Sequence, residues 1–169
     1  MKMGHTSMNV RSFDYRFGNV CNYKCRHCEP NNSSLLELEE KKYNANYKPI
    51  KSTTNATVRF ENLEKEILTS AYNGTLEELQ WAGGESLFSE SHWRIMQEII
   101  KNGDPSKIKV SYITNLSIME YKGIQLLELL DKFKEGIKNQ RTIYINRPDQ
   151  LYDTRVYPRS AYRNAIRTD

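Results

Sequence analysis

The stretch SFDYRFGNVCNYKCRHC, residues 12–28, contains the two features around which the chain is organised. Its first half places aromatic side chains at alternate positions, Phe13, Tyr15 and Phe17, which predicts a β-strand over residues 12–20 with a Gly-Asn turn near its end. Its second half holds all three cysteines of the protein. The sequence therefore predicts a strand that leads directly into a cysteine-rich loop.

The cysteines of this loop, Cys21, Cys25 and Cys28, follow the spacing C-x3-C-x2-C. An odd number of clustered thiols does not suit a disulfide framework, and no apolar secretory signal precedes them, so we expect a cytoplasmic metal or redox site. Three thiolates on a short loop can hold three corners of a 4Fe–4S cluster and leave the fourth iron open. Residues 30–34, PNNSS, close the loop and offer an N-cap for a following helix.

A structural zinc site is the alternative that this spacing leaves open. It would be of Cys3His type, with His5, His27 or His92 as its fourth ligand. His27 lies between two of the cysteines, which makes it an awkward ligand, and the second C-x2-C of a zinc ribbon is missing. The corresponding function would be a small zinc-binding interaction module with a basic tail that contacts nucleic acid.

Length and composition indicate one globular domain with room for a hydrophobic core. The chain has 169 residues, of which 38% are hydrophobic and 27% charged, and its mean hydropathy is -0.75. No apolar run approaches the roughly 18 residues that a membrane span needs. The net charge of +4 is mild, so charge alone gives little support for nucleic-acid binding.

Downstream of the cysteine loop, predicted helices and strands alternate. We expect strands at residues 76–81, 108–114 and 142–145, and helices at residues 35–42, 60–72, 92–102 and 121–133. Residues 43–57 are polar and are expected to form a surface loop. In the last helix, Ile124, Leu127 and Leu130 are expected to share the apolar face. The repeated order of strand, loop and helix predicts βα units and a parallel sheet.

Polar motifs follow the first three predicted strands. The cysteine loop comes after the first, Gly83-Gly84-Glu85 after the second and Thr114-Asn115 after the third. Ligands of such folds gather at the carboxyl ends of the strands, so we expect these motifs to converge. Taken alone, the Gly-Gly pair would be a turn and Glu85 a solvated carboxylate or helix cap, while His92 and Trp93 are expected to serve as helix cap and core.

The C-terminal part of the chain differs in composition from the rest. Residues 139–169 contain six Arg and no Lys, whereas residues 1–138 contain 14 Lys and five Arg. Three interpretations stay open for this tail: an Arg- and Tyr-rich arm for nucleic acid, a disordered segment, and a stretch translated in a shifted frame. The predicted domain plan is an N-terminal tail over residues 1–11, a folded domain over 12–145 and this tail over 146–169.

The cysteine spacing, with His27 just before the last cysteine, resembles the signature of the radical SAM superfamily. The run WAGGE, residues 81–85, resembles the GGE motif of that family, and YITNL, residues 112–116, resembles its third-strand segment. Residues 21–34 are similar to twitch domain-containing members, which often read C-N-x-K-C-x-x-C-x-P-x-x-S-S. The resemblance covers about residues 13–145 and implies an α/β fold, a partial (β/α) TIM-type barrel of about three to four parallel βα units.

The resemblance implies a radical SAM iron–sulfur enzyme in which Cys21, Cys25 and Cys28 ligate a 4Fe–4S cluster. S-adenosyl-L-methionine would bind the open iron and be cleaved reductively to a 5′-deoxyadenosyl radical, which abstracts hydrogen from an unknown substrate. The cofactor-binding residues that the resemblance implies are Gly83 and Gly84 at the methionyl group, Glu85 at its ammonium, His27 near the adenine, and Asn115 as a polar contact.

The chain departs from the family pattern in several places, and these departures determine which partners we expect. Ser86 stands where the family usually has the proline of GGEP, and no cysteine follows Cys28 to ligate an auxiliary cluster. The later barrel strands have no visible counterpart, which leaves an open parallel edge. We expect an electron donor such as a flavodoxin or ferredoxin, no membrane partner, and a homo-oligomer or partner chain that closes this edge. A truncated or frame-shifted family member is the alternative.

Overall fold

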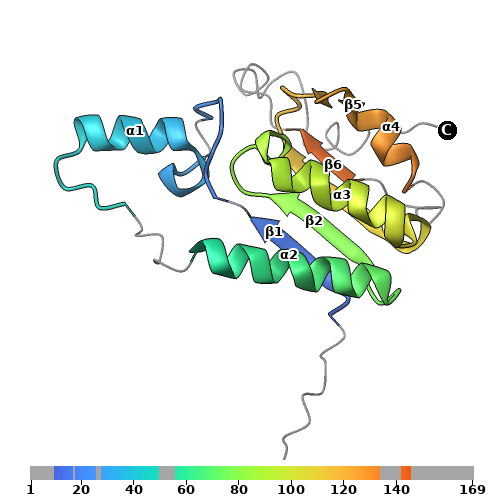
Figure 1. Cartoon of the computed structure of the whole chain (residues 1–169). Coiled ribbons are helices and arrows are strands. Elements are labelled where there is room, and N and C mark those ends of the chain that lie inside the picture. The colour runs from blue at the N-terminus through green and yellow to red at the C-terminus, as the bar shows by residue number, and fades with distance from the viewer. Residues whose placement is uncertain (1–9, 17, 26–27, 50–55, 134–141, 146–169) are drawn as a thin grey trace, which may run out of the picture.

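The computed structural model describes residues 10–16, 18–25, 28–49, 56–133 and 142–145. Its four-stranded sheet consists of β1 (Ser12–Arg16), β2 (Glu78–Ala82), β3 (Lys109–Thr114) and β6 (Thr142–Ile145). The helices are α1 (Ser34–Tyr43), α2 (Ala56–Tyr72), α3 (Glu90–Asn102) and α4 (Leu126–Asp131). Figure 1 shows α2 and α3 running along the sheet, with α1 set apart from it.

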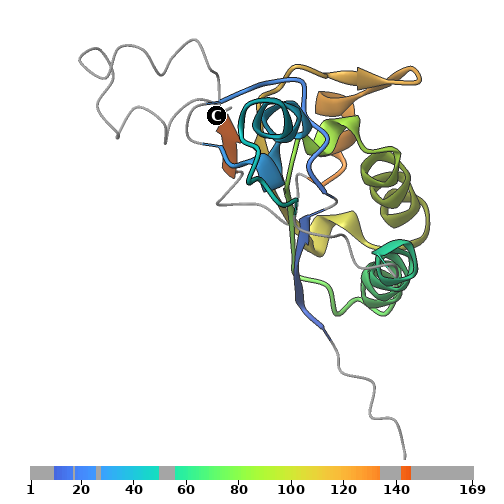
Figure 2. The ribbon, with the colours of Figure 1, turned by 90° about the vertical axis from the view of Figure 1, so that its left-hand side faces the viewer.

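The sheet is parallel throughout, and its strands are ordered β1-β2-β3-β6. Figure 2 shows α2 and α3 together on one side of the sheet. A doubly wound sheet would reverse its strand order and carry helices on both faces. Sequential strands with helices on one side match the wall of a (β/α) barrel. The α/β class and the parallel βα units are confirmed. The described residues form an open parallel sheet rather than a closed barrel, so the partial barrel stays a prediction.

Side chains of the sheet alternate between a buried face and an outer face. In β1, Phe13 and Tyr15 are buried, whereas Asp14 and Arg16 point to the other face and form an ion pair at 2.8 Å. The strand register aligns Tyr15 with Trp81 of β2, and Trp81 with Tyr112 of β3. An aromatic row therefore crosses the buried face of three strands.

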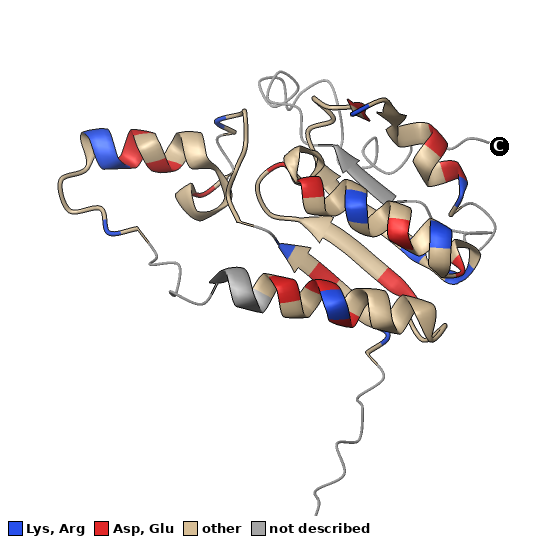
Figure 3. Cartoon of the chain, in the orientation of Figure 1, with Lys and Arg blue, Asp and Glu red and all other residues tan. Residues whose placement is uncertain are grey.

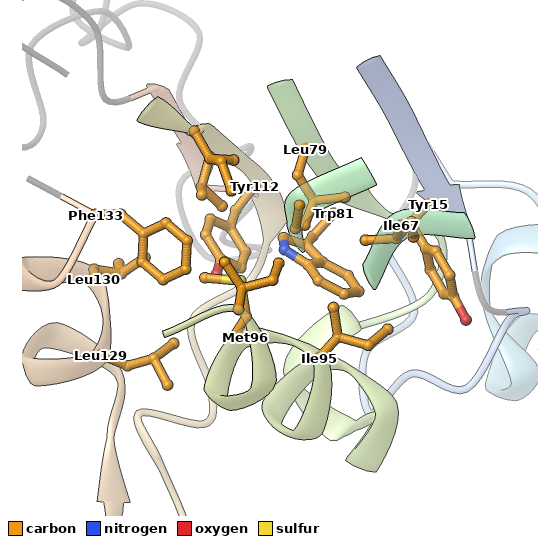
Figure 4. Packing of buried hydrophobic residues seen from close by; sticks show 14 of the residues in the cluster. Tyr15, Ile67, Leu79, Trp81, Ile95, Met96, Tyr112, Leu129, Leu130 and Phe133 are labelled. Carbon is orange, nitrogen blue, oxygen red and sulfur yellow. The ribbon is translucent and has the colours of Figure 1, made fainter. Parts of the chain in front are cut away.

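Helix α3 covers Trp81 and Tyr112 of this row (Figure 4), whereas Tyr15 lies against α2, where its hydroxyl donates to Glu64 at 3.2 Å. The buried side chains of α3 include Trp93, Ile95 and Met96, and Figure 4 shows Ile95 and Met96 beneath Trp81 and Tyr112. Each large apolar side chain that is fully buried stabilises the fold by about 1.5–3 kcal/mol. Trp93 was expected in the core and lies there, whereas the expected cap role of His92 is wrong, because Ser89 is the N-cap of α3 and His92 is buried.

The predicted helix over residues 121–133 is wrong in its first part. A small antiparallel hairpin, β4 (Glu120–Tyr121) and β5 (Ile124–Gln125), precedes α4. Lys122 and Gly123 both adopt positive φ, 48° and 82°, as a two-residue hairpin turn requires. The helix therefore starts later and turns a different face to the core.

The altered start of α4 overturns the predicted apolar face of this segment. Leu126, Leu129 and Leu130 are buried, whereas Leu127, which was expected to face the core, is 55% exposed. Smaller differences occur elsewhere: α2 begins at Ala56, inside the predicted surface loop, and β1 ends at Arg16. Residues 1–9 of the predicted N-terminal tail (1–11) and the predicted tail over residues 146–169 lie outside the described residues.

Charged side chains of both signs are interspersed along the helices, as Figure 3 shows for α1, α2 and α3. Helix α1 has Glu37 in its first turn and Lys41 in its last, paired at 2.6 Å, in the order that the helix dipole favours. In the part of the chain that is described, no helix has the length and apolar character of a membrane span.

Candidate functional site

A hollow opens at the carboxyl ends of β1, β2 and β3. It is lined by the three cysteines and Tyr23 from the loop after β1, by Gly84-Glu85 after β2, and by residues 113–115 at the end of β3. Its empty volume, open mouth included, is about 350 Å³. The three sequence motifs therefore converge on one space, as expected for a parallel sheet.

Two serines at the start of α1 close the cysteine loop. Ser33 caps the helix: its Oγ accepts from the Leu36 N–H at 3.4 Å and donates to the Tyr23 carbonyl at 2.8 Å. The Ser34 Oγ accepts from the Cys21 N–H at 3.3 Å. The predicted N-cap is confirmed, and the helix start and the cysteine loop are built as one unit.

The cysteine side chains are free thiols that lie near one another. Cys25 is buried, and the Cys28 N–H donates to its carbonyl at 3.0 Å. Burial, together with the charges of Cys21 and Cys28, raises the pKa of the Cys25 thiol. Burial raises the pKa of Cys28 as well, with a further contribution from Cys21 and an opposing hydrogen bond from the backbone at Glu29. The electrostatic repulsion that contributes to these two raised pKa values indicates that thiolates of the three cysteines would lie close together in one small space.

The donor set fits a soft, positively charged group, although no coordination geometry is formed. Among the described residues, no three or more His, Cys, Asp or Glu side chains are arranged to hold a metal ion. Thiolates are the ligands that iron–sulfur clusters and zinc prefer. Bound metal would offset the repulsion among Cys21, Cys25 and Cys28, because its positive charge stabilises their deprotonated forms.

Gly83 and Gly84 allow the loop after β2 to lie against the chain that enters the cysteine loop. Both have positive φ, 80° and 56°. A Cβ on Gly84 would stand 2.4 Å from the Val20 carbonyl oxygen, and one on Gly83 would stand 3.1 Å from the Arg16 Cβ. The Glu85 N–H donates to the Val20 carbonyl at 2.8 Å. The close approach at this glycine pair is thus to the chain's own backbone.

Glu85 is buried, and it is neither a solvated carboxylate nor a cap for α3. Its Oε1 accepts from the Leu87 N–H at 3.2 Å and from the Thr114 hydroxyl at 2.5 Å. Its Oε2 accepts from the Asn115 N–H at 2.7 Å. The carboxylate therefore joins the loop after β2 to the end of β3, and it caps a short 3-10 turn that begins at Ser86.

Asn115 joins the end of β3 to the cysteine loop. Its Nδ2 donates to the Asn22 Oδ1 at 2.9 Å and lies 3.9 Å from the Cys21 Sγ. The Ser117 hydroxyl also donates to the Asn22 Oδ1, at 3.3 Å. Sequence reasoning missed Asn22, to which only its adjacency to Cys21 could have pointed. Thr114 belonged to an expected polar motif but was given no role of its own.

The candidate histidine ligands do not meet the cysteines in the described residues. His92 is completely buried in the core, where its Nε2 lies 2.9 Å from the Tyr112 hydroxyl. His92 is therefore wrong as a zinc ligand. His5 and His27 lie outside the described residues, so the role predicted for His27 at the adenine stays a prediction.

Comparison with known proteins identifies the family to which the chain belongs. The profile described as the Radical SAM superfamily matches residues 15–168, which is most of the chain. No curated protein and no solved structure matches. Because the family profile covers more than half of the sequence, and because the cysteine loop, GGE run and third strand meet at one hollow, the chain belongs to the radical SAM superfamily.

Proposed function

We propose that the chain binds a 4Fe–4S cluster and S-adenosyl-L-methionine, and that it generates a 5′-deoxyadenosyl radical that abstracts hydrogen from an unknown substrate. The observation that carries this proposal is the hollow, in which Cys21, Cys25 and Cys28 face Glu85 and Asn115 across the strand ends. Membership of the family supports the same chemistry.

The three thiols would hold the cluster, and Glu85 would receive the ammonium of the methionyl group. A carboxylate has about four acceptor positions, of which Glu85 uses three, for Leu87, Thr114 and Asn115. The remaining position on Oε2 can accept one charge-assisted hydrogen bond without loss of the others. The existing bonds fix the carboxylate in place, so little ordering is left to the moment of binding.

Gly83, Gly84, His27 and Asn115 complete the proposed cofactor site. The glycines let the loop after β2 lie close against Arg16 and Val20. His27 is proposed near the adenine, and Asn115 as a polar contact, on the family resemblance alone.

When bound, a reduced cluster supplies the electron that cleaves the sulfonium bond of S-adenosyl-L-methionine. The residues of the protein would bind and orient the two cofactors and shield them from water. Cys25 and Glu85 are both buried, so water has little access to the sides of the hollow that they form. An electron donor such as a flavodoxin or ferredoxin would supply the reducing equivalent.

Several finer properties belong to the same proposal. The run over residues 21–34 supports a likeness to twitch domain-containing members. Clustered free thiols suit a reducing compartment, and hence the cytoplasm. Strands β1 and β6 are the outer strands of the described sheet, so a second copy or a partner chain could close the open parallel edge there. A zinc-binding module is less well supported, because His92 is held in the core by Tyr112.

The reaction is tested on anaerobically reconstituted protein. With dithionite and S-adenosyl-L-methionine, the wild type is expected to release 5′-deoxyadenosine and methionine, and Cys25→Ala is expected to release neither. Protein that carries a full cluster and yet forms no 5′-deoxyadenosine would contradict the proposed function.

A further inference from the structure

We propose that Asn22 and Asn115 form an amide clamp that positions Cys21 and donates a hydrogen bond to its sulfur. The clamp consists of Asn22, Asn115 and Ser117. The inference rests on the proposed cluster site, and it assigns a positioning role to Asn22 and Asn115 in place of a direct contact between Asn115 and the cofactor.

The orientation of the Asn115 amide is fixed by its partners. Its Oδ1 accepts from the Ser117 N–H at 2.8 Å. Its Nδ2 must then face the other way, where the Asn22 Oδ1 accepts at 2.9 Å and the Cys21 Sγ lies at 3.9 Å. The reverse orientation would set two donors against each other at Ser117 and two acceptors against each other at Asn22.

The clamp is one part of a hydrogen-bonded circuit around Cys21. On one side of this cysteine, the Val20 carbonyl accepts from the Glu85 N–H at 2.8 Å. On the other side, Asn22 is held by Asn115. The circuit closes because the Glu85 carboxylate accepts from the Asn115 N–H at 2.7 Å. Both neighbours of Cys21 are thereby tied to the strand ends, at sequence separations of more than sixty residues.

The sulfur of Cys21 differs from that of Cys28 in its surroundings. Two N–H groups approach the Cys21 Sγ, the Tyr23 backbone at 3.5 Å and Asn115 at 3.9 Å. The Cys28 Sγ lies 3.7 Å from the Asn32 carbonyl oxygen and has one backbone hydrogen bond, at Glu29, but no side-chain amide donor among the described residues. Donors stabilise negative charge on sulfur, and a cluster gains negative charge on reduction, so the clamp favours the reduced state and raises the reduction potential.

Three substitutions distinguish the loss of the clamp's hydrogen bonds from the effect of an added negative charge. Asn115→Asp removes the amide donor and adds a negative charge. Asn22→Asp adds the same charge at the exposed partner position but keeps an acceptor for Asn115 and Ser117. Asn22→Ala removes the acceptor without adding charge. Asn22 is exposed, so its two variants are expected to fold like the wild type, which circular dichroism checks.

The readouts are the midpoint potential of the cluster, from EPR-monitored redox titration, and the rate of iron loss to a chelator. At a fixed potential we expect the reduced-to-oxidised ratio of Asn115→Asp to be about tenfold below that of Asn22→Asp, or about 59 mV for a one-electron couple. We expect Asn22→Ala to lose iron several-fold faster than Asn22→Asp or the wild type.

Each combination of potentials and iron-loss rates given below either supports or overturns the amide clamp. Equal potentials for Asn115→Asp and Asn22→Asp, with equal iron loss for Asn22→Ala and the wild type, would overturn the clamp and leave the proposed function intact. A wild type that assembles no cluster would overturn both. The expected differences in a wild type that does carry the cluster would support the clamp, whether or not the substrate is known.

Discussion

The core beneath the sheet and the hollow at its end are built from the same strands but held together in different ways. Trp81 of β2 is completely buried among apolar side chains, and Glu85, four residues later, is buried among hydrogen-bond donors. The core depends on apolar area, which is non-directional, whereas the hollow depends on a few directional bonds between loops. Fold and site can therefore be damaged separately.

Cys25→Ala is expected to damage the site most strongly while leaving the fold nearly unchanged. Removal of one of three thiols leaves too few ligands for a cluster, so iron and sulfide binding should fall to background after reconstitution. The free energy of unfolding of the apo protein should change by only about 1 kcal/mol, because a single small side chain is lost. Iron analysis and urea unfolding measure the two effects. Retention of iron at the wild-type level would contradict the assignment.

A substitution in the core should do the reverse. Leu79 is fully buried in β2, and Leu79→Ala is expected to lower the free energy of unfolding by about 2–5 kcal/mol. The folded fraction should bind as much iron per molecule as the wild type. Leu127→Ala is the matched control, because that side chain is 55% exposed and its loss should change stability by no more than about 0.5 kcal/mol. Equal effects of the two substitutions would argue against the described core.

Gly84→Ala should damage both regions, because it lies where they join. The new methyl group would stand 2.4 Å from the Val20 carbonyl oxygen at a positive φ, and we expect a loss of about 2–4 kcal/mol of stability together with weaker iron binding. Gly74→Ala is the control: Gly74 also has positive φ but no atom within 4 Å of the new Cβ. It should lose only about 1–2 kcal/mol and keep its iron. Similar iron loss in both variants would contradict the packing role of Gly84.

The smallest expected effect is the pH dependence due to His92. Burial lowers the pKa of His92 from 6.5 to about 3, so the unfolded chain binds a proton there that the folded chain does not. The free energy of unfolding should therefore fall as pH drops below 6.5, by up to about 1.36 kcal/mol per pH unit and about 2 kcal/mol by pH 5. Urea unfolding across this range should show a flatter profile for His92→Phe. An unchanged slope in the His92→Phe variant would show that the pH dependence of stability arises from another group.

Local pattern was sufficient to predict most of the fold. The alternation of Phe13 and Tyr15 predicted β1, because such a signal lies within a few residues. The repeated order of strand, loop and helix predicted the parallel sheet. The hairpin at Lys122-Gly123 was missed, because a lysine at positive φ has no strong sequence signal. That error shifted the helix phase and misplaced Leu127.

The site was predictable only as far as its residues are local or follow a recurrent motif. The spacing of Cys21, Cys25 and Cys28 and the GGE run pointed to the same sheet end. The bond between Asn22 and Asn115 was not predictable, because it joins residues 93 positions apart through side chains of common type. The burial of Glu85 depends likewise on donors that β3 supplies.

We propose above that this hollow holds a cluster with an iron open to S-adenosyl-L-methionine. The EPR spectrum of the reduced, anaerobically reconstituted protein, recorded with its iron content before and after S-adenosyl-L-methionine is added, tests this proposal. We expect about four irons per chain and a signal that changes on addition of the cofactor. A colourless protein that binds only zinc, or a cluster whose signal the cofactor leaves unaltered, would contradict the proposal.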